Sequence, residues 1–188
     1  MNEFQVRVEN VVAFTSLGID IPLVKISGKL KDAEYSPESF PGVVYRIKEP
    51  KAASLIFSSG KLVCTGTKSV DQAKEATNTV LGHIRDLGIK IPKKYHINIE
   101  NIVASTKIDA RLGLEDISFS LDDVEYEPEQ FPGLVCRIPE PRVAFLLFGS
   151  GKIICTGGRT IEDIHGALAK LKEKLESIGI EVKASKWF

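Results

Sequence analysis

Histidine and cysteine side chains are the groups that most often perform catalysis or bind metals. The three histidines are scattered along the chain, at His83, His96 and His165. The cysteines are Cys64, Cys136 and Cys155, and no pair of them has the spacing of zinc ligands. We expect all three thiols to be reduced and buried, since an odd number in apolar segments fits a reducing compartment. The sequence therefore predicts no metal site, no cofactor and no enzymatic activity.

Adjacent carboxylates are the other candidate for metal chemistry. They occur as Glu115-Asp116 and Asp122-Asp123, in or near a short predicted helix of one half of the chain only. We interpret them as solvated charges. An enzyme acting on nucleic acid is the alternative, and magnesium-dependent cleavage would support it.

The residues that recur in matched pairs are aromatic, amide, hydroxyl and basic groups, because the chain is an internal duplication. Residues 35–66 align with residues 126–157 without a gap, and 20 of the 32 paired positions are identical. The match extends to residues 10–13 and 101–104. A two-fold relation between the halves, 1–91 and 92–188, is therefore expected to shape whatever the protein binds.

Composition limits the classes of function. The 188 residues carry no net charge, with 43% hydrophobic and 27% charged residues, which is typical of a globular protein rather than one that holds nucleic acid mainly by charge. The first half carries 12 basic and 10 acidic residues (12 − 10 = +2) and the second 13 and 15 (13 − 15 = −2). There is no apolar run of membrane-spanning length and no signal-peptide pattern at the N-terminus. We expect an intracellular protein without a membrane partner.

The hydrophobic periodicity predicts the same elements in each half. In the first half these are a strand at 4–14, a short helix at 19–30, strands at 31–35, 43–48, 52–57 and 61–65, and a long helix between Ser69 and Gly88. The second half repeats the series, beginning with a strand at 95–105, a helix at 112–121 and a strand at 122–126, and its long helix ends at Gly179. Ten strands and four helices predict an α+β fold, one antiparallel sheet with helices on a single face.

The other face of this sheet is predicted to be apolar as well. Successive side chains of a strand point to opposite faces of the sheet, and in residues 143–148 both sets of alternate residues (the two parities) are apolar. Ala144, Leu146 and Phe148 form one of these sets. A contiguous apolar face that no helix covers marks an interaction site. The alternative is that a second layer or a dimer covers it.

Two Phe-Pro-Gly loops place aromatic rings near one edge of that face. Phe40-Pro41 and Phe131-Pro132 lie in the loops, while Phe57 and Phe148 end strands on the uncovered parity. Symmetric pairs of this kind suit wedging between stacked bases. The alternative is that each loop phenylalanine caps its own core.

Polar candidates follow the same duplication. Asn10/Asn101 and Thr65/Thr156 offer amides and hydroxyls among β-branched residues, where an asparagine is poorly placed unless it meets acceptors. Arg46/Arg137 and Lys61/Lys152 offer two positive charges per half at the margins, enough to contact phosphates. Each could singly be an ordinary surface residue, and it is their repetition that favours a site.

These segments resemble the TATA-box-binding protein family in its archaeal form. The resemblance covers essentially the whole chain, through Asn-Val-Val-Ala and Asn-Ile-Val-Ala, the two Phe-Pro-Gly loops, Phe-Ser-Ser-Gly-Lys and its copy, and the Cys-Thr-Gly strand ends. It implies a saddle-shaped, pseudo-two-fold duplication, a ten-stranded antiparallel sheet with four helices on the convex face. It also implies that the concave face binds the minor groove of A·T-rich promoter DNA, without catalysis.

The resemblance assigns roles to the paired residues. Phe40 with Phe57 and Phe131 with Phe148 would be wedges that kink the DNA. Central base pairs would be bound by Asn10, Asn101, Thr65 and Thr156. The floor of the groove would be contacted by Val12, Val103, Leu55, Leu146, Val63 and Ile154. The DNA backbone would be reached by Arg46, Arg137, Lys61 and Lys152.

Partners also follow from the resemblance. Glu127 and Glu129 match the acidic positions that meet transcription factor B in the family, and Gln130 stands where the family often has leucine. RNA polymerase would be recruited indirectly. The protein would act in a prokaryotic cytoplasm, at the chromosome, and the chain ends Lys186-Trp187-Phe188 rather than in the acidic tail of some archaeal members. A non-catalytic scaffold that uses the apolar face to hold a partner, or its own copy as a homodimer, is the alternative.

Overall fold

The computed structural model describes residues 4–183, so the C-terminal Lys186–Phe188 lie outside the described part. It contains two compact units: the N-terminal unit is Asn10–Glu100, and within the described residues the C-terminal unit is 4–9 with 101–183. The first strand, β1 (Arg7–Ser16), thus contributes residues to both units.

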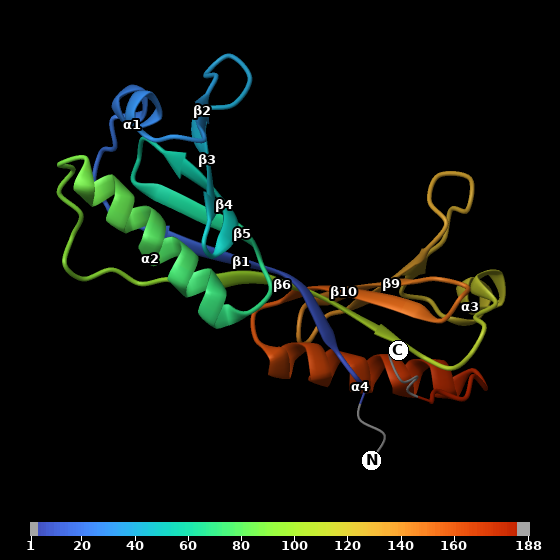
Figure 1. The fold of residues 1–188 in the computed structure, drawn as a ribbon. Coiled ribbons are helices and arrows are strands. Elements are labelled where there is room, and N and C mark those ends of the chain that lie inside the picture. Colours follow the sequence, from blue (N-terminus) through green and yellow to red (C-terminus); the bar gives the residue numbers. More distant parts are fainter. Residues whose placement is uncertain (1–3, 184–188) are drawn as a thin grey trace. The chain divides into compact units, whose positions relative to one another are not determined.

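The N-terminal unit is an antiparallel sheet backed by a long helix. Its strands lie in the order β2-β3-β4-β5-β1 (Figure 1). After β1 come α1 (Leu23–Lys29), β2 (Ala33–Tyr35), β3 (Gly42–Lys48), β4 (Lys51–Phe57), β5 (Lys61–Thr67) and α2 (Val70–Asp86).

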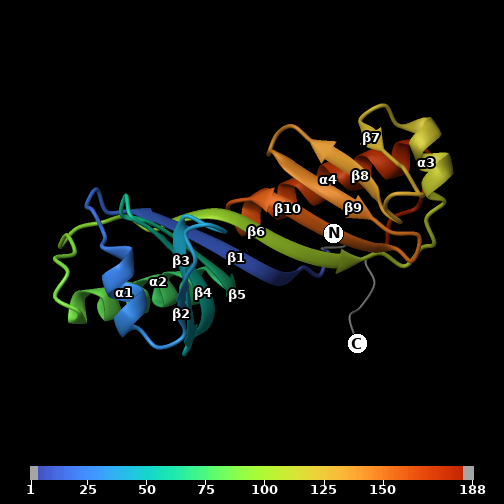
Figure 2. The same ribbon diagram turned by 90° about the horizontal axis from the view of Figure 1, so that it is seen from above.

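The C-terminal unit repeats this arrangement, with strand order β6-β10-β9-β8-β7. Its elements are β6 (Asn98–Lys107), α3 (Leu114–Ser120), β7 (Val124–Glu125), β8 (Leu134–Ile138), β9 (Val143–Leu147), β10 (Lys152–Gly158) and α4 (Ile161–Ser177). Figure 2 shows α4 running along strands β8, β9 and β10, which it contacts.

The long helices begin and end where the sequence predicts. The Ser69 hydroxyl accepts a hydrogen bond from the N–H of Gln72, and Thr160 forms a reciprocal capping box with Asp163. Each cap satisfies N–H groups that have no partner within the helix. Gly88 (φ 82°) and Gly179 (φ 85°) follow the last turns in the left-handed conformation that glycine adopts at low cost.

Side-chain contacts identify the sheet face that each helix covers. The Tyr45 hydroxyl lies 2.8 Å from Nδ1 of His83 on α2, and the Cys64 thiol interacts with Thr77 of the same helix. In the C-terminal unit, α4 packs against β8, β9 and β10. All three cysteines are buried and reduced, as predicted.

The short helices are where the sequence prediction was wrong at the boundaries. The helix predicted at 19–30 starts only at Leu23 and ends at Lys29. Residues 17–21 instead follow the β4–β5 turn, because Leu17 N–H donates to Gly60 and Ile21 N–H donates to the carbonyl of Ser58. These bonds and the left-handed Gly18 (φ 63°) keep the segment out of the helix, and Pro22 directly precedes it. The first strand is likewise shifted, from 4–14 to Arg7–Ser16.

Candidate nucleic-acid interface

Opposite α2, the sheet of the N-terminal unit presents a half-buried apolar surface. Along β4 the residues Ala52, Ser54 and Ile56 are buried, while those between them are half-buried. The same alternation holds along β1 and β5. We call this surface the N-terminal open face; it comprises Asn10, Val12, Phe14, Val44, Ala53, Leu55, Phe57, Val63 and Thr65.

The C-terminal unit has an equivalent surface opposite α4. In β9, Val143, Phe145 and Leu147 are buried against the helix side, and the residues of the other parity are half-buried. The C-terminal open face comprises Asn101, Val103, Val135, Ala144, Leu146, Phe148, Ile154 and Thr156. In both units the sequence therefore correctly predicted which parity the helix leaves uncovered.

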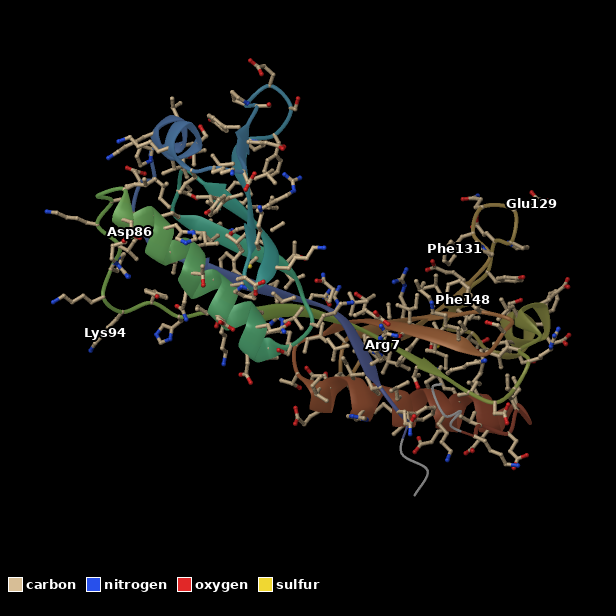
Figure 3. The ribbon with its side chains drawn as sticks, in the orientation of Figure 1. Arg7, Asp86, Lys94, Glu129, Phe131 and Phe148 are labelled. Atoms are coloured by element: carbon tan, nitrogen blue, oxygen red, sulfur yellow. The ribbon has the colours of Figure 1, made fainter. Side chains whose placement is uncertain are left out.

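Each open face carries an aromatic pair at one end. The rings of Phe40 and Phe57 meet edge-on, with centroids 5.6 Å apart, and those of Phe131 and Phe148 do so at 5.9 Å. Figure 3 shows Phe131 in its loop above Phe148, with Glu129 farther out. Phe131 is 39% exposed, so its ring is not a sealed cap on the core. The rings are packed on each other yet accessible from the open face.

Glycine makes room for each aromatic pair. A Cβ added at Gly42 would lie 2.8 Å from Cε1 of Phe40, and one at Gly133 would lie 2.6 Å from Cε1 of Phe131. Real Cβ atoms are not found at such distances, so the glycine of each Phe-Pro-Gly loop allows the ring to fold back over the sheet. The prolines, Pro41 and Pro132, are exposed.

The predicted asparagines and threonines are brought together in pairs. Asn10 Nδ2 donates to Oγ1 of Thr65 at 2.9 Å, and Asn101 Nδ2 donates to Oγ1 of Thr156 at 3.2 Å. All four are half-buried on the open faces. Each face therefore has one polar site among apolar neighbours.

The predicted basic residues lie at the margins. Arg46 forms an ion pair with Glu34 and Arg137 forms one with Glu125, each at 3.3 Å and largely exposed to solvent. Such exposed pairs contribute little to stability, so a phosphate can compete for either arginine. Lys61 and Lys152 are exposed at the start of their strands.

Phe14 is a residue of the open face that sequence reasoning missed. Its ring lies beneath the Lys61 ammonium, which is 5.3 Å from the ring centroid. Phe14 shares the parity of Asn10 and Val12, and this was the signal that could have identified it. At the equivalent position is Ser105, which is buried and donates a 2.6 Å hydrogen bond to Glu9.

The acidic loop of the C-terminal unit projects into solvent. Glu127, Glu129 and Gln130 are exposed, and the Glu127 carbonyl accepts the N–H groups of Gln130 and Phe131 at 2.9 Å. The first loop closes in the same way on the Ser36 carbonyl. The two loops thus share a backbone turn but differ in charge.

Titratable groups suited to catalysis do not gather on these faces. Among residues 4–183 no three histidine, cysteine or acidic side chains converge in a metal-binding cluster. Burial raises the pKa of the Cys155 thiol to about 12, and burial also raises the pKa of Cys64. Within the same residues, no helix is long and apolar enough to span a membrane.

The protein therefore consists of two homologous repeats, each an antiparallel sheet with one face left uncovered by helices. Each uncovered face is apolar and carries one amide–hydroxyl pair and one aromatic pair. Known proteins of this class match the chain. The family model described as transcription factor TFIID (or TATA-binding protein, TBP) matches residues 5–87 and again residues 96–178. The chain belongs to the TATA-binding protein family, which confirms the resemblance seen in the sequence.

Individual relatives agree with this assignment. A TATA-box-binding protein of Archaeoglobus fulgidus is 46% identical over 96% of this chain and 100% of its own length. TATA-box-binding protein B of Halobacterium salinarum is 49% identical over 93% of this chain and 95% of its own. The structure of Methanococcus jannaschii TBP superposes with a TM-score of 0.85 at 42% identity, covering 92% of this chain and 99% of that one. The predicted fold, a ten-stranded antiparallel open sheet with four helices, is confirmed.

Proposed function

We propose that this protein is a general transcription initiation factor that binds the minor groove of A·T-rich promoter DNA. The observation that carries the proposal is the pair of open faces, because each combines a contiguous apolar surface with a single amide–hydroxyl site. The relatives named TATA-box-binding proteins support it. The protein acts by binding alone and performs no catalysis.

The chemistry of the open faces fits an A·T minor groove. That groove presents only acceptors, N3 of adenine and O2 of thymine, whereas a G·C pair adds the amino group of guanine. Val12, Leu55 and Val63 in one unit pack on the floor of the groove, as do their counterparts Val103, Leu146 and Ile154. An amino group pressed against this floor would lose its hydrogen bonds to water without replacement.

The aromatic pairs kink the DNA by partial insertion between base pairs. Unstacking costs a few kcal/mol per step, and flexible TA steps lower the cost of deformation. The family is an established example of such wedges, and Phe40, Phe57, Phe131 and Phe148 take this role here. Arg46, Arg137, Lys61 and Lys152 contact the backbone.

The two repeats, 1–91 and 92–188, act together as one DNA-binding domain. The exposed loop with Glu127, Glu129 and Gln130 recruits transcription factor B, which brings in RNA polymerase. The first loop is less acidic, with Ser36 at the position of Glu127. This difference favours recruitment on one side. The complex forms on the chromosome in a prokaryotic cytoplasm.

A promoter-binding assay tests the proposal. An A·T-rich promoter fragment labelled with two dyes is compared with a copy in which the central A·T pairs are replaced by G·C. We expect a gel shift and a shorter dye-to-dye distance with the first fragment and a much weaker response with the second. Equal affinity for both fragments would reject the proposal.

A homodimer is proposed as the resting form of the free protein. The half-buried apolar residues of the open faces are unfavourable in water, which supports pairing through them. Promoter DNA should then dissociate the dimer in analytical ultracentrifugation. Persistence of the dimer at saturating DNA would instead favour a scaffold that uses the open faces for protein binding.

A further inference from the structure

A bulge in β5 leaves one backbone N–H outside the strand ladder. Val11 pairs with Thr67 and Ala13 pairs with Cys64, so β5 has one residue more than β1 in this interval. A bulge of this kind leaves its extra residue unpaired. The N–H of Gly66 (φ 95°) donates instead to Oδ1 of Asn10 at 2.8 Å.

The same device is present in the C-terminal unit. Strand β10 has its extra residue between the pairs Cys155–Ala104 and Gly158–Ile102. Gly157 (φ 108°) donates its N–H to Oδ1 of Asn101 at 2.7 Å. The recurrence indicates that the bulge and the asparagine belong to one structural unit.

This hydrogen bond decides which way each amide points. A backbone N–H can only donate, so the asparagine oxygen must face the glycine and the nitrogen must face away. Consistent with this, Nδ2 donates to the oxygen of Thr65 or Thr156. The reversed amide would set two donors against each other and leave both unsatisfied.

We infer that Gly66 and Gly157 are positioning residues that lock Asn10 and Asn101 with their amide hydrogens toward the ligand. The second Nδ2 hydrogen of each asparagine is then available for binding. Each threonine oxygen accepts one bond from Nδ2, and its hydroxyl can donate either to Oδ1, at 3.3 Å and 3.5 Å in the two units, or to the ligand. The amide of each asparagine therefore presents a donor, not its oxygen, to the ligand.

An amide fixed with its hydrogens toward the ligand favours a base-pair edge that carries only acceptors. This inference rests on the proposed function and adds to it the origin of discrimination at the central base pairs. Adenine N3 and thymine O2 accept, whereas the guanine amino group would meet another donor. The apolar residues leave no room for the guanine amino group. The locked amides disfavour it as well, because they place a donor opposite a donor.

The test replaces the N–H of Gly66 with an ester oxygen, by introducing glycolic acid at that position. This change keeps the absence of a side chain and removes the lock. Three promoter fragments are compared, with the central pairs as A·T, as inosine·cytosine, which lacks the amino group, or as G·C. The matched control is the same ester at Gly18, another glycine of positive φ (63°) that lies outside the site.

The wild-type protein and the Gly18 ester should bind A·T and inosine·cytosine alike and G·C more weakly. In the Gly66 ester the amide can reverse and offer its oxygen, so the preference for inosine·cytosine over G·C should shrink by about tenfold. A uniform loss of affinity for all three fragments, or no change, would overturn the inference. Absence of any A·T preference in the wild-type protein would instead refute the proposed function.

A measurement on the unmodified protein covers the case in which the ester does not fold. In the free protein, nuclear Overhauser contacts from the Asn10 amide hydrogens should reach Thr65 and should be weak to the N–H of Gly66. Strong contacts between the Asn10 amide hydrogens and the Gly66 N–H would mean a reversed amide, and the inference would fail.

Discussion

The ring of Phe131 lies edge-on against the ring of Phe148, with an interplanar angle of 69°. One ring comes from a loop and the other follows the end of β9, so each orients the other before any ligand arrives. Edge-to-face pairs are favourable in their own right. In the proposed DNA complex, this pair would enter the duplex as a preformed wedge.

Truncation within this pair should affect DNA binding more than folding. Phe148→Ala removes a half-buried ring and should lower the free energy of unfolding by about 1 kcal/mol, but weaken promoter affinity at least about tenfold. Phe145→Ala is the matched control, since that ring is fully buried. Its loss should cost ~3–5 kcal/mol of stability. Urea melts and gel shifts on both variants check this, and equal destabilisation by the two would place Phe148 in the core.

Gly133→Ala should displace the wedge without unfolding the protein. The new Cβ would lie 2.6 Å from Cε1 of Phe131 and 3.2 Å from Cε1 of Phe148, and both atoms are at the ends of side chains that can move. We expect a change in unfolding free energy within about 1 kcal/mol and a smaller DNA bend in the two-dye assay. An unchanged bend would contradict the positioning of Phe131 by Gly133.

Gly166→Ala serves as the control for that substitution. Gly166 lies within α4 and a Cβ there would meet no atom within 4 Å. Alanine loses less conformational entropy than glycine in a helix, so this variant should gain about 0.5–1 kcal/mol in stability and bend DNA normally. The stability of this variant is measured by the same urea melts, and its DNA bending by the same two-dye assay.

The free energy of unfolding should fall as the pH rises above the ordinary pKa of a cysteine thiol. Burial raises the pKa of Cys155 from 9.0 to about 12, so between these values the unfolded chain releases a proton that the folded protein retains. The stabilisation is complete below pH 9 and is lost as the pH rises towards 12, at up to ~1.4 kcal/mol per pH unit. The difference in unfolding free energy between wild type and Cys155→Ala should narrow over this window. A constant difference would mean that the thiol ionises equally in both states.

Charge reversal in the acidic loop should separate partner binding from DNA binding. Glu129→Lys should weaken the supershift by transcription factor B about tenfold and leave the promoter complex intact, because the residue is exposed away from the open face. Glu38→Lys, the equivalent change in the first loop, is the control. If both variants lose the supershift equally, recruitment does not depend on the charge difference between the loops.

The fold, and the strand residues that the helices leave uncovered, were predictable from the sequence because each strand and helix pattern occurs once in each repeat. The apolar residues on both sides of β9 and the helix start at Ser69 are local patterns, and the structure follows them. The start of α1 was not predictable from periodicity, since backbone bonds to Ser58 and Gly60 compete with the helix. Those bonds join residues about forty positions apart, which no local pattern encodes.

The candidate site was predicted as a set of residues but not as contacts. Asn10 and Thr65 were separate candidates, and only the sheet register brings them together. The role of Gly66 depends on a bulge, which sequence alone does not reveal. Phe14 has no aromatic counterpart at Ser105, so an argument based on repetition overlooked it.

Residues 5–9 belong to the C-terminal unit, although the whole N-terminal unit lies between them and the rest of it in the sequence. The Gln5 carbonyl accepts a 2.8 Å hydrogen bond from the Thr106 hydroxyl, and Glu9 accepts one from Ser105. During synthesis, Gln5 and Glu9 must therefore wait until about a hundred further residues have emerged before these bonds can form. Residues 5–9 can complete their native contacts only after the whole N-terminal unit has been synthesised.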